Sequence, residues 1–157
     1  QKDILFYTDK ADKKSKTKYK TDDLTEFKVA DKLYHCIHYS GGLFSKPINA
    51  NLVVKVDCIT EYVWYDRAED YMTMRKTASE TNEEFYARMY PPTTLFLKAG
   101  EEDVKTISGF ALKFTEKMSE WIADNAELAE KISSKEKGYG MLHLLDIIEQ
   151  YNESCEK

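Results

Sequence analysis

The sequence predicts an α+β fold: an antiparallel β-sheet (a meander or roll) in the amino-terminal two-thirds of the chain, covered by two to three carboxy-terminal helices. Before residue 108, apolar side chains tend to alternate with polar ones, as in strands that bury one face. After it they recur every three or four residues, as in amphipathic helices. A run of strands followed by a run of helices is typical of this fold class. The 157 residues fit a single domain over 1–157, mostly β over 1–107 and mostly α over 108–157.

Short apolar or alternating runs predict the first strands. Residues 4–7 form one such run, and residues 33–39 alternate along their length. Residues 52–65 are too many for one typical strand of about five to six residues. They form either a single long strand or, in the interpretation that we favour, a hairpin that turns at Asp57 and Cys58.

The middle of the chain is less regular. Residues 71–74 are predicted as a strand and residues 76–84 as a polar loop. Residues 85–90 suit a strand or a turn of helix, and Pro91 and Pro92 end either one. The last pair of strands is predicted at 94–97 and 104–107, joined by a turn at 99–102.

An apolar stripe at helical spacing predicts a helix that begins after Ser108, its expected N-cap, and stops near Asp124 and Asn125. Gly109 weakens its start. Burial of five apolar side chains contributes about 10 kcal/mol in total. Ordering the backbone costs about 1–2 kcal/mol per residue, so we expect this helix to form only when it is docked on the rest of the protein. The stripe consists of Phe110, Phe114, Met118, Trp121 and Ile122.

Two further helical segments follow. A short one is predicted over 126–132, and Gly138 and Gly140 then interrupt the pattern. The polar face of the last helix carries acidic residues, whereas helices that lie on membranes usually carry Lys and Arg there. We therefore expect this helix to pack on the core. Its stripe consists of Met141, Leu144, Leu145, Ile148 and Tyr151.

Composition narrows the class of protein. The net charge of −5 argues against a nucleic-acid partner, and no apolar run approaches the length of about 20 residues that spans a bilayer. The chain opens at Gln1 rather than at a methionine, which is compatible with the removal of a signal peptide. The odd count of cysteines (Cys36, Cys58 and Cys155) permits one disulfide with a free thiol, or three buried free thiols.

The residue types that serve in metal sites and catalysis do not assemble into a recognisable motif. His35 and His38 flank Cys36, but on a strand the two histidines point to opposite faces. Cys36 and His38 alone supply too few ligands for zinc, and His143 is remote in sequence. No serine has a nucleophile-elbow context, and no glycine-rich loop suits a phosphate. We expect no metal and no cofactor, and an enzyme is the least favoured interpretation.

Two segments are candidates for binding. Residues 10–20 contain six lysines and one aspartate and could contact an anionic lipid or glycan, although a solvated loop is the interpretation that we favour. Tyr62 and Trp64 share one face of a predicted strand and Tyr65 takes the other. If part of this strand is exposed, these aromatic rings could stack on a sugar or anchor a protein; otherwise they pack beneath the helices.

Three parts of the tail form a recognisable pattern: residues 121–132, Lys135 with Glu136, and residues 147–152. This pattern resembles one found in small uncharacterised exported proteins of Bacteroidetes-type bacteria. The front of the chain is similar more loosely, at residues 19–24, 56–59 and 94–107. The sequence departs from the pattern at Asn125-Ala126, where Cys-Pro is usual, and at Cys58, where the turn glycine is usual. The resemblance implies a signal peptide and an envelope or secreted location, and it implies no activity.

These observations together predict a non-enzymatic module of the cell envelope or the secreted space that binds another macromolecule or supports an assembly. The partner would be an envelope protein or a glycan. The alternative is a small-ligand or glycan-binding domain that uses Tyr62, Trp64 and Tyr65.

Overall fold

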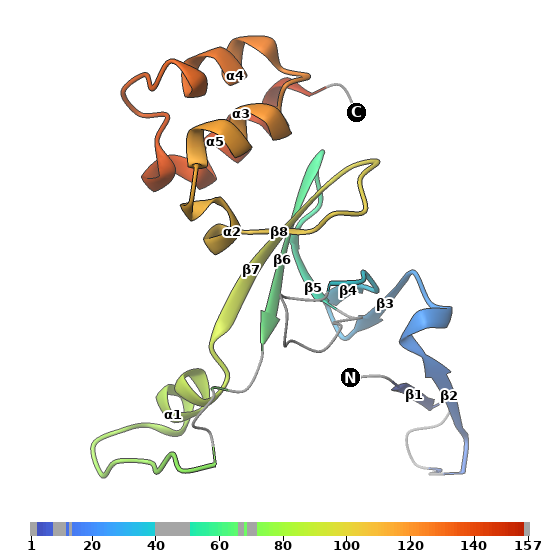
Figure 1. Ribbon diagram of the computed structural model, residues 1–157. Helices are drawn as coiled ribbons and strands as arrows, with labels where there is room; N and C mark the ends of the chain where they lie inside the picture. The colour runs from blue at the N-terminus through green and yellow to red at the C-terminus, as the bar shows by residue number, and fades with distance from the viewer. Residues whose placement is uncertain are drawn as a thin grey trace.

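The computed structural model describes residues 3–7, 12, 14–39, 51–65, 68 and 72–155. Antiparallel strands occupy the front of the chain and helices its end, which confirms the predicted α+β class (Figure 1). The strands are β1 (Asp3–Tyr7), β2 (Lys16–Lys20), β3 (Glu26–Val29), β4 (Lys32–His35), β5 (Asn51–Lys55), β6 (Ile59–Tyr65), β7 (Pro92–Lys98) and β8 (Lys105–Thr106). The helices are α1 (Asn82–Met89), α2 (Ile107–Ala111), α3 (Phe114–Trp121), α4 (Ala126–Ser133) and α5 (Leu144–Ser154), with short 3-10 turns at Thr21–Asp23 and Met141–His143.

The main sheet is a meander. Its six strands, β3 to β8, lie in the order of the sequence, and each pairs antiparallel with the next. Strands β1 and β2 form a separate two-stranded ribbon. No helix in the described part of the chain has both the length and the apolar character needed to cross a bilayer.

The hairpin predicted within residues 52–65 is confirmed, with β5 and β6 as its arms. Its turn needs no glycine because side chains hold it. The Thr60 hydroxyl donates to the Asp57 carbonyl at 3.0 Å, and the Asp57 carboxylate accepts from the Cys58 N–H at 3.0 Å. Short polar side chains stabilise turns in this way by bonding to nearby backbone groups.

Two predictions for the middle of the chain, the strand at 71–74 and the loop at 76–84, are wrong. Residues 72–73 form a turn and Met74 lies outside any strand, so no strand covers 72–74, while Tyr71 lies outside the described residues. Helix α1 begins inside the predicted loop because Thr81 and Glu84 form a capping box, in which each side chain bonds to the backbone of the other residue. This resolves residues 85–90 as helical up to Met89.

The strand predicted over 33–39 ends at His35, and Ile107, predicted as strand, instead begins helix α2. Residues 16–20, placed in the predicted lysine-rich loop, form strand β2. The bounds of β2 and β4 follow their pairing with β1 and β5, which single-strand periodicity does not report. At Ile107 the strand ends because Thr106 caps helix α2.

The first predicted helix is two helices that meet at a corner. The N-cap of α2 is Thr106, not Ser108, since the Thr106 hydroxyl accepts from the Gly109 N–H at 3.0 Å. A Cβ at Gly109 would lie 3.1 Å from that hydroxyl, so the glycine suits the cap. Lys113 then adopts a left-handed conformation (φ 61°) between α2 and α3. Such a residue breaks the helical path.

The main core joins the helices to one end of the sheet (Figure 1). Ile59 of β6 and Phe96 of β7 are the buried sheet residues in it. All five residues of the first predicted stripe are buried, which confirms that stripe. The second predicted stripe, in the last helix, is partly wrong: Leu145 is 54% exposed, and Ile147 is buried instead. The helical residues of the core are Phe110, Phe114, Met118, Trp121, Ile122, Leu128, Ile132, Leu144, Ile147, Ile148 and Tyr151.

Two links tie α5 to the start of β6. The Asn152 side chain accepts from the Ile59 N–H at 2.7 Å and donates to the Ile59 carbonyl at 3.0 Å, as a neighbouring strand would. Cys58 and Cys155 form a disulfide between residues 97 apart in sequence, which leaves Cys36 as the free thiol. Of the two alternatives predicted for the cysteines, the structure shows the first: one disulfide and one free thiol.

We expect Asn152→Ala to lower the free energy of unfolding by about 2–4 kcal/mol. The change leaves the buried N–H and C=O of Ile59 without partners, and each unsatisfied group costs about 1–3 kcal/mol. Urea denaturation followed by circular dichroism measures the loss. Glu153→Ala, at the next and exposed position of α5, is the matched control and should have little effect. Equal effects of the two changes would contradict this role for Asn152.

Candidate binding site

The structure places the three aromatic residues of β6 in different surroundings. Tyr62 is 3% exposed, and its hydroxyl lies 3.0 Å from Nδ1 of His35. Trp64 is half-buried against the small cluster of Tyr62, Leu95 and Val104, whereas Tyr65 is 55% exposed. Burial raises the pKa of Tyr62. The rings of Tyr62 and Trp64 thus serve mainly as packing, but in a cluster of the sheet that is separate from the helical core and not beneath the helices as predicted. The three residues do not form one exposed surface.

The residues considered for a metal site are also separated. His35 contacts Tyr62 and lies 3.6 Å from the Glu26 carboxylate, whereas His38 is exposed. Burial, with a smaller effect of Asp22, raises the pKa of the Cys36 thiol, which disfavours the thiolate needed for metal binding or nucleophilic attack.

One group of side chains in the described residues has the spacing of metal ligands, namely Asp57, Cys58 and Cys155. The two sulfur atoms in this group are bonded to each other, so they are not available as thiolates. The hydrogen bonds of two histidines likewise do not form a nucleophile–base pair of the Ser-His or Cys-His type. His35 and His143 bond to Tyr62 and to Asp146, not to a serine, threonine or cysteine.

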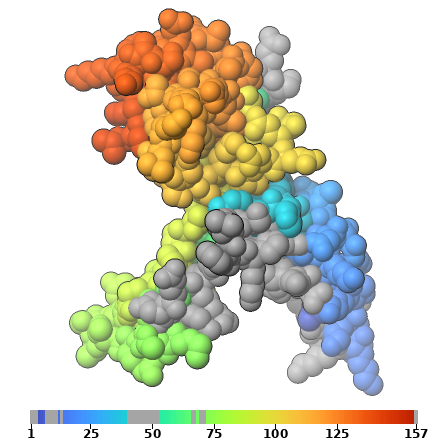
Figure 2. Space-filling model, viewed as in Figure 1, coloured from blue at the N-terminus to red at the C-terminus, as the bar shows by residue number. Residues whose placement is uncertain are grey.

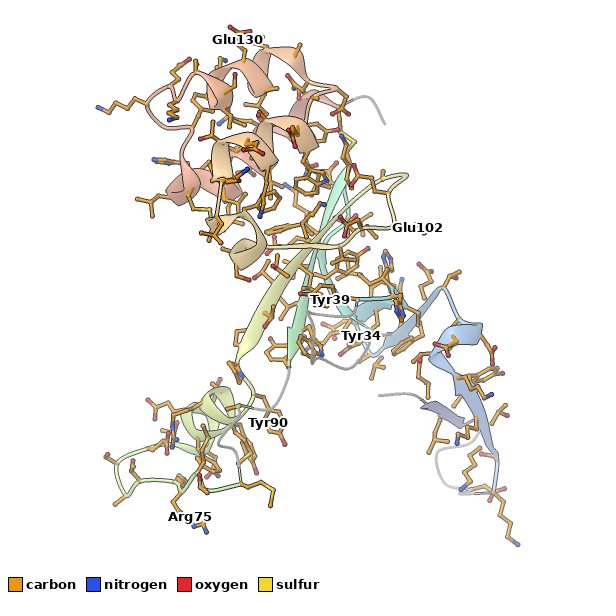
Figure 3. All side chains as sticks on the ribbon, in the orientation of Figure 1. Tyr34, Tyr39, Arg75, Tyr90, Glu102 and Glu130 are labelled. Atoms are coloured by element: carbon orange, nitrogen blue, oxygen red, sulfur yellow. A yellow bond between two sulfur atoms is a disulfide. The ribbon has the colours of Figure 1, made fainter. Side chains whose placement is uncertain are left out.

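A concave site lies where the end of the sheet meets α2 and α3. We call it the Trp121 pocket; it has a volume of about 490 Å³. One wall comes from the β7–β8 turn and β8, and the other comes from the two helices (Figure 3 labels Glu102, in that turn). The lining residues are Glu101, Val104, Lys105, Thr106, Gly109, Phe110, Lys117, Glu120 and Trp121.

The floor of the Trp121 pocket is apolar and fixed. The rings of Phe110 and Trp121 have centroids 5.3 Å apart and are tilted by 41°. The Trp121 indole N–H donates to the Glu101 carboxylate at 2.9 Å, which locks the ring against the β7–β8 turn. Both rings also belong to the main core, so the shape of the floor is set by the packing of the whole helical region.

The mouth of the pocket carries four charged side chains, of which three already have partners. Lys117 donates to the Gly109 carbonyl at 2.6 Å, Lys105 pairs with Asp103, and Glu101 accepts from Trp121. Glu120 is exposed, and its carboxylate has no hydrogen bond or ion pair with any residue that the structure describes. Lys117 and Glu101 bond to neutral groups, so Lys105 is the only one of the four that has a counter-ion among the described residues. The other three charges, two carboxylates and one ammonium, sum to −1, which suits a cationic group.

A second pocket, of about 530 Å³, lies beside the disulfide, and its charged groups satisfy one another. The Lys98 ammonium donates to the Asp124 carboxylate at 2.7 Å and to the Trp121 carbonyl at 2.8 Å. The Tyr151 hydroxyl donates to the other oxygen of Asp124 at 2.6 Å. This network bridges the end of β7 to the helices, and we interpret it as a structural link.

The pKa values of this network follow from its geometry. Burial alone would raise the pKa of Asp124, but the hydrogen bonds from Lys98 and Tyr151 outweigh it and hold the pKa below its ordinary value. Burial would lower the pKa of Lys98, yet the bonds to Asp124 and Tyr151 raise it. Burial and the bond to Asp124 together raise the pKa of Tyr151. The ion pair is thus charged and the phenol neutral at neutral pH, with no group poised to exchange a proton there.

The Trp121 pocket was not predicted from the sequence. Trp121 and Phe110 were recognised only as core residues, and Glu101 was noted only as part of a turn. No local pattern marks the pocket, because its walls are about 20 residues apart in the chain and meet only in the fold. Comparison of the chain with protein-family models, with curated proteins and with solved structures finds no match.

Proposed function

We propose that this protein is a non-enzymatic binding or assembly module of the cell envelope or the secreted space, and that it engages its partner at the Trp121 pocket. The observation that supports this most is the combination found there: an apolar aromatic floor held rigidly, and one unpaired carboxylate, Glu120, at the mouth. Binding sites typically combine apolar walls with a few polar groups that fix orientation. A partner that presents a lysine or arginine side chain fits this site best.

The disulfide supports the proposed location. Bridges such as Cys58–Cys155 persist in oxidising compartments, which include the periplasm and the extracellular space, and are rare in the cytosol of mesophiles. The resemblance of the tail to exported proteins of Bacteroidetes-type bacteria points the same way.

Site-specific photo-crosslinking in the native cells tests the proposal. A photoreactive amino acid at position 105 or 117, both of which line the pocket, should give one discrete protein adduct. The matched control is position 130, on the outer surface of α4, which should give none (Figure 3 labels Glu130). Introducing Glu120→Lys alongside the probe at position 105 should abolish the adduct, because it replaces the free carboxylate with a cation.

Three outcomes can be separated in this experiment. No adduct from either pocket position, or an equal adduct from position 130, would overturn the proposed site. An adduct of small mass in place of a protein would support the alternative, a small-ligand domain, at the same pocket. The volume of about 490 Å³ lies in the range of small-molecule sites.

A further inference from the structure

The ribbon formed by β1 and β2 carries its lysines on one face. Lys16, Lys18 and Lys20 lie at alternate positions of β2, so their side chains share a face. Leu5 is directly opposite Lys18 in the register and lies on that face as well. We call Leu5, Lys16, Lys18 and Lys20 the lysine face.

The lysine face is exposed and stands away from the helices. All five residues of β2 are exposed, and Leu5 is 47% exposed. Strands β1 and β2 pair with each other and with no other described strand. Figure 2 shows this ribbon (blue) at the edge of the molecule, remote from the helical end (orange).

Charge is distributed unevenly along the chain. The first 20 residues contain seven lysines and three aspartates, a net charge of +4, whereas the remaining 137 residues have a net charge of −9. Five lysines elsewhere in the described residues pair with carboxylates: the ion pairs are Lys55–Glu149, Lys98–Asp124, Lys105–Asp103, Lys113–Glu116 and Lys131–Glu127. Lys16 and Lys20 form no ion pair with a described residue.

Protection against aggregation does not account for this pattern. Lysines on an exposed strand do discourage pairing with other chains, but they do so from either face of the strand. Here all three occupy the same face. Their cross-strand partners in β1 are Tyr7, Leu5 and Asp3, and Leu5, opposite the middle lysine, is exposed.

We propose that the lysine face docks the protein on the anionic headgroups of a membrane surface. Each lysine near an anionic bilayer strengthens binding by roughly five-fold, so Lys16 and Lys20 together give a gain on the order of 25-fold. Leu5 is placed to enter the boundary between headgroups and acyl chains. A soluble anionic glycan would make no use of the exposed leucine, which is why we favour lipid.

Vesicle co-sedimentation of the full chain tests this inference, which is independent of the Trp121 pocket. The protein should bind vesicles of phosphatidylcholine mixed with phosphatidylglycerol, and should not bind vesicles of phosphatidylcholine alone. Binding should weaken with added salt, because screening shortens the range of the charges. A triple variant, Lys16→Gln with Lys18→Gln and Lys20→Gln, should lose affinity by at least about 25-fold.

The matched control removes three exposed lysines elsewhere, by Lys28→Gln, Lys32→Gln and Lys137→Gln, and should retain nearly all the affinity. Leu5→Ser should weaken vesicle binding by several-fold if the leucine enters the lipid. Equal binding to both kinds of vesicle, or an equal loss in the control, would overturn the inference. Two results together would also overturn the inference: heparin competes with vesicles for the wild-type protein, and Leu5→Ser has no effect on vesicle binding. They would identify a site for soluble polyanions.

Discussion

Replacing both Cys58 and Cys155 by serine is expected to lower the free energy of unfolding by about 2–5 kcal/mol. The bridge joins residues 97 apart, and a cross-link that closes so long a loop removes much of the conformational freedom of the unfolded chain. It also fastens the end of α5 to the β5–β6 turn, beside the bonds between Asn152 and Ile59. Urea denaturation of the oxidised protein and the variant measures the difference.

Cys36→Ser is the control for the disulfide prediction. Cys36 is the free, half-buried thiol, so its replacement should cost much less than loss of the bridge. Reducing agent should destabilise the wild type to the level of the double variant and leave the double variant unchanged. A double variant as stable as the oxidised wild type would show that the bridge does not stabilise the fold.

Trp121→Ala is expected to destabilise the protein by about 3–5 kcal/mol, the range for removing a large aromatic side chain from a core. Trp121 is buried, packs against Phe110, and donates its indole N–H to Glu101. The change therefore leaves a cavity at the centre of the helical core and removes the hydrogen bond to the β7–β8 turn. Thermal unfolding followed by circular dichroism measures it.

Leu142→Ala is the matched control for Trp121→Ala. Leu142 is 98% exposed in the same helical region, so its truncation should change stability by less than about 0.5 kcal/mol. An unchanged melting temperature for Trp121→Ala would mean that the apolar side of α3 does not belong to the core.

The spacing of apolar residues predicted those features of the fold that are set within a single helix or strand. The spacing of Phe110, Phe114, Met118 and Trp121 identified a buried helical face, and each of these residues is buried. The corner at Lys113 was not predicted. The left-handed Lys113 ends the helical path, but the apolar residues on both sides of it are still buried, so their spacing gives no sign of the break. The capping box of Thr81 and Glu84 was a readable local signal that the sequence analysis overlooked.

Features that join distant parts of the chain could not be read from the sequence. The Lys98–Asp124 pair links residues 26 apart, and the disulfide links residues 97 apart. No local pattern encodes such partners, since they are set by how the helices dock on the end of β6 and β7. The alternation of Tyr62, Trp64 and Tyr65 was visible, but the burial of Tyr62 depends on neighbouring strands.

We infer that the helices and the end of the sheet form one cooperative unit. Helices α3 and α4 have eight residues each and α5 has eleven, all below the length of about 12–15 residues at which isolated helices become even marginally stable. They should therefore fold only against Ile59 and Phe96.

The most direct test uses Trp121→Phe, in which Trp64 of β6 is the only remaining tryptophan. Urea denaturation of this variant is followed by Trp64 fluorescence, which reports the sheet, and by circular dichroism at a helical wavelength, which reports mainly α1 to α5. We predict that the two transitions coincide, as in two-state unfolding. Loss of the helical signal at a lower urea concentration than the fluorescence change would contradict the claim.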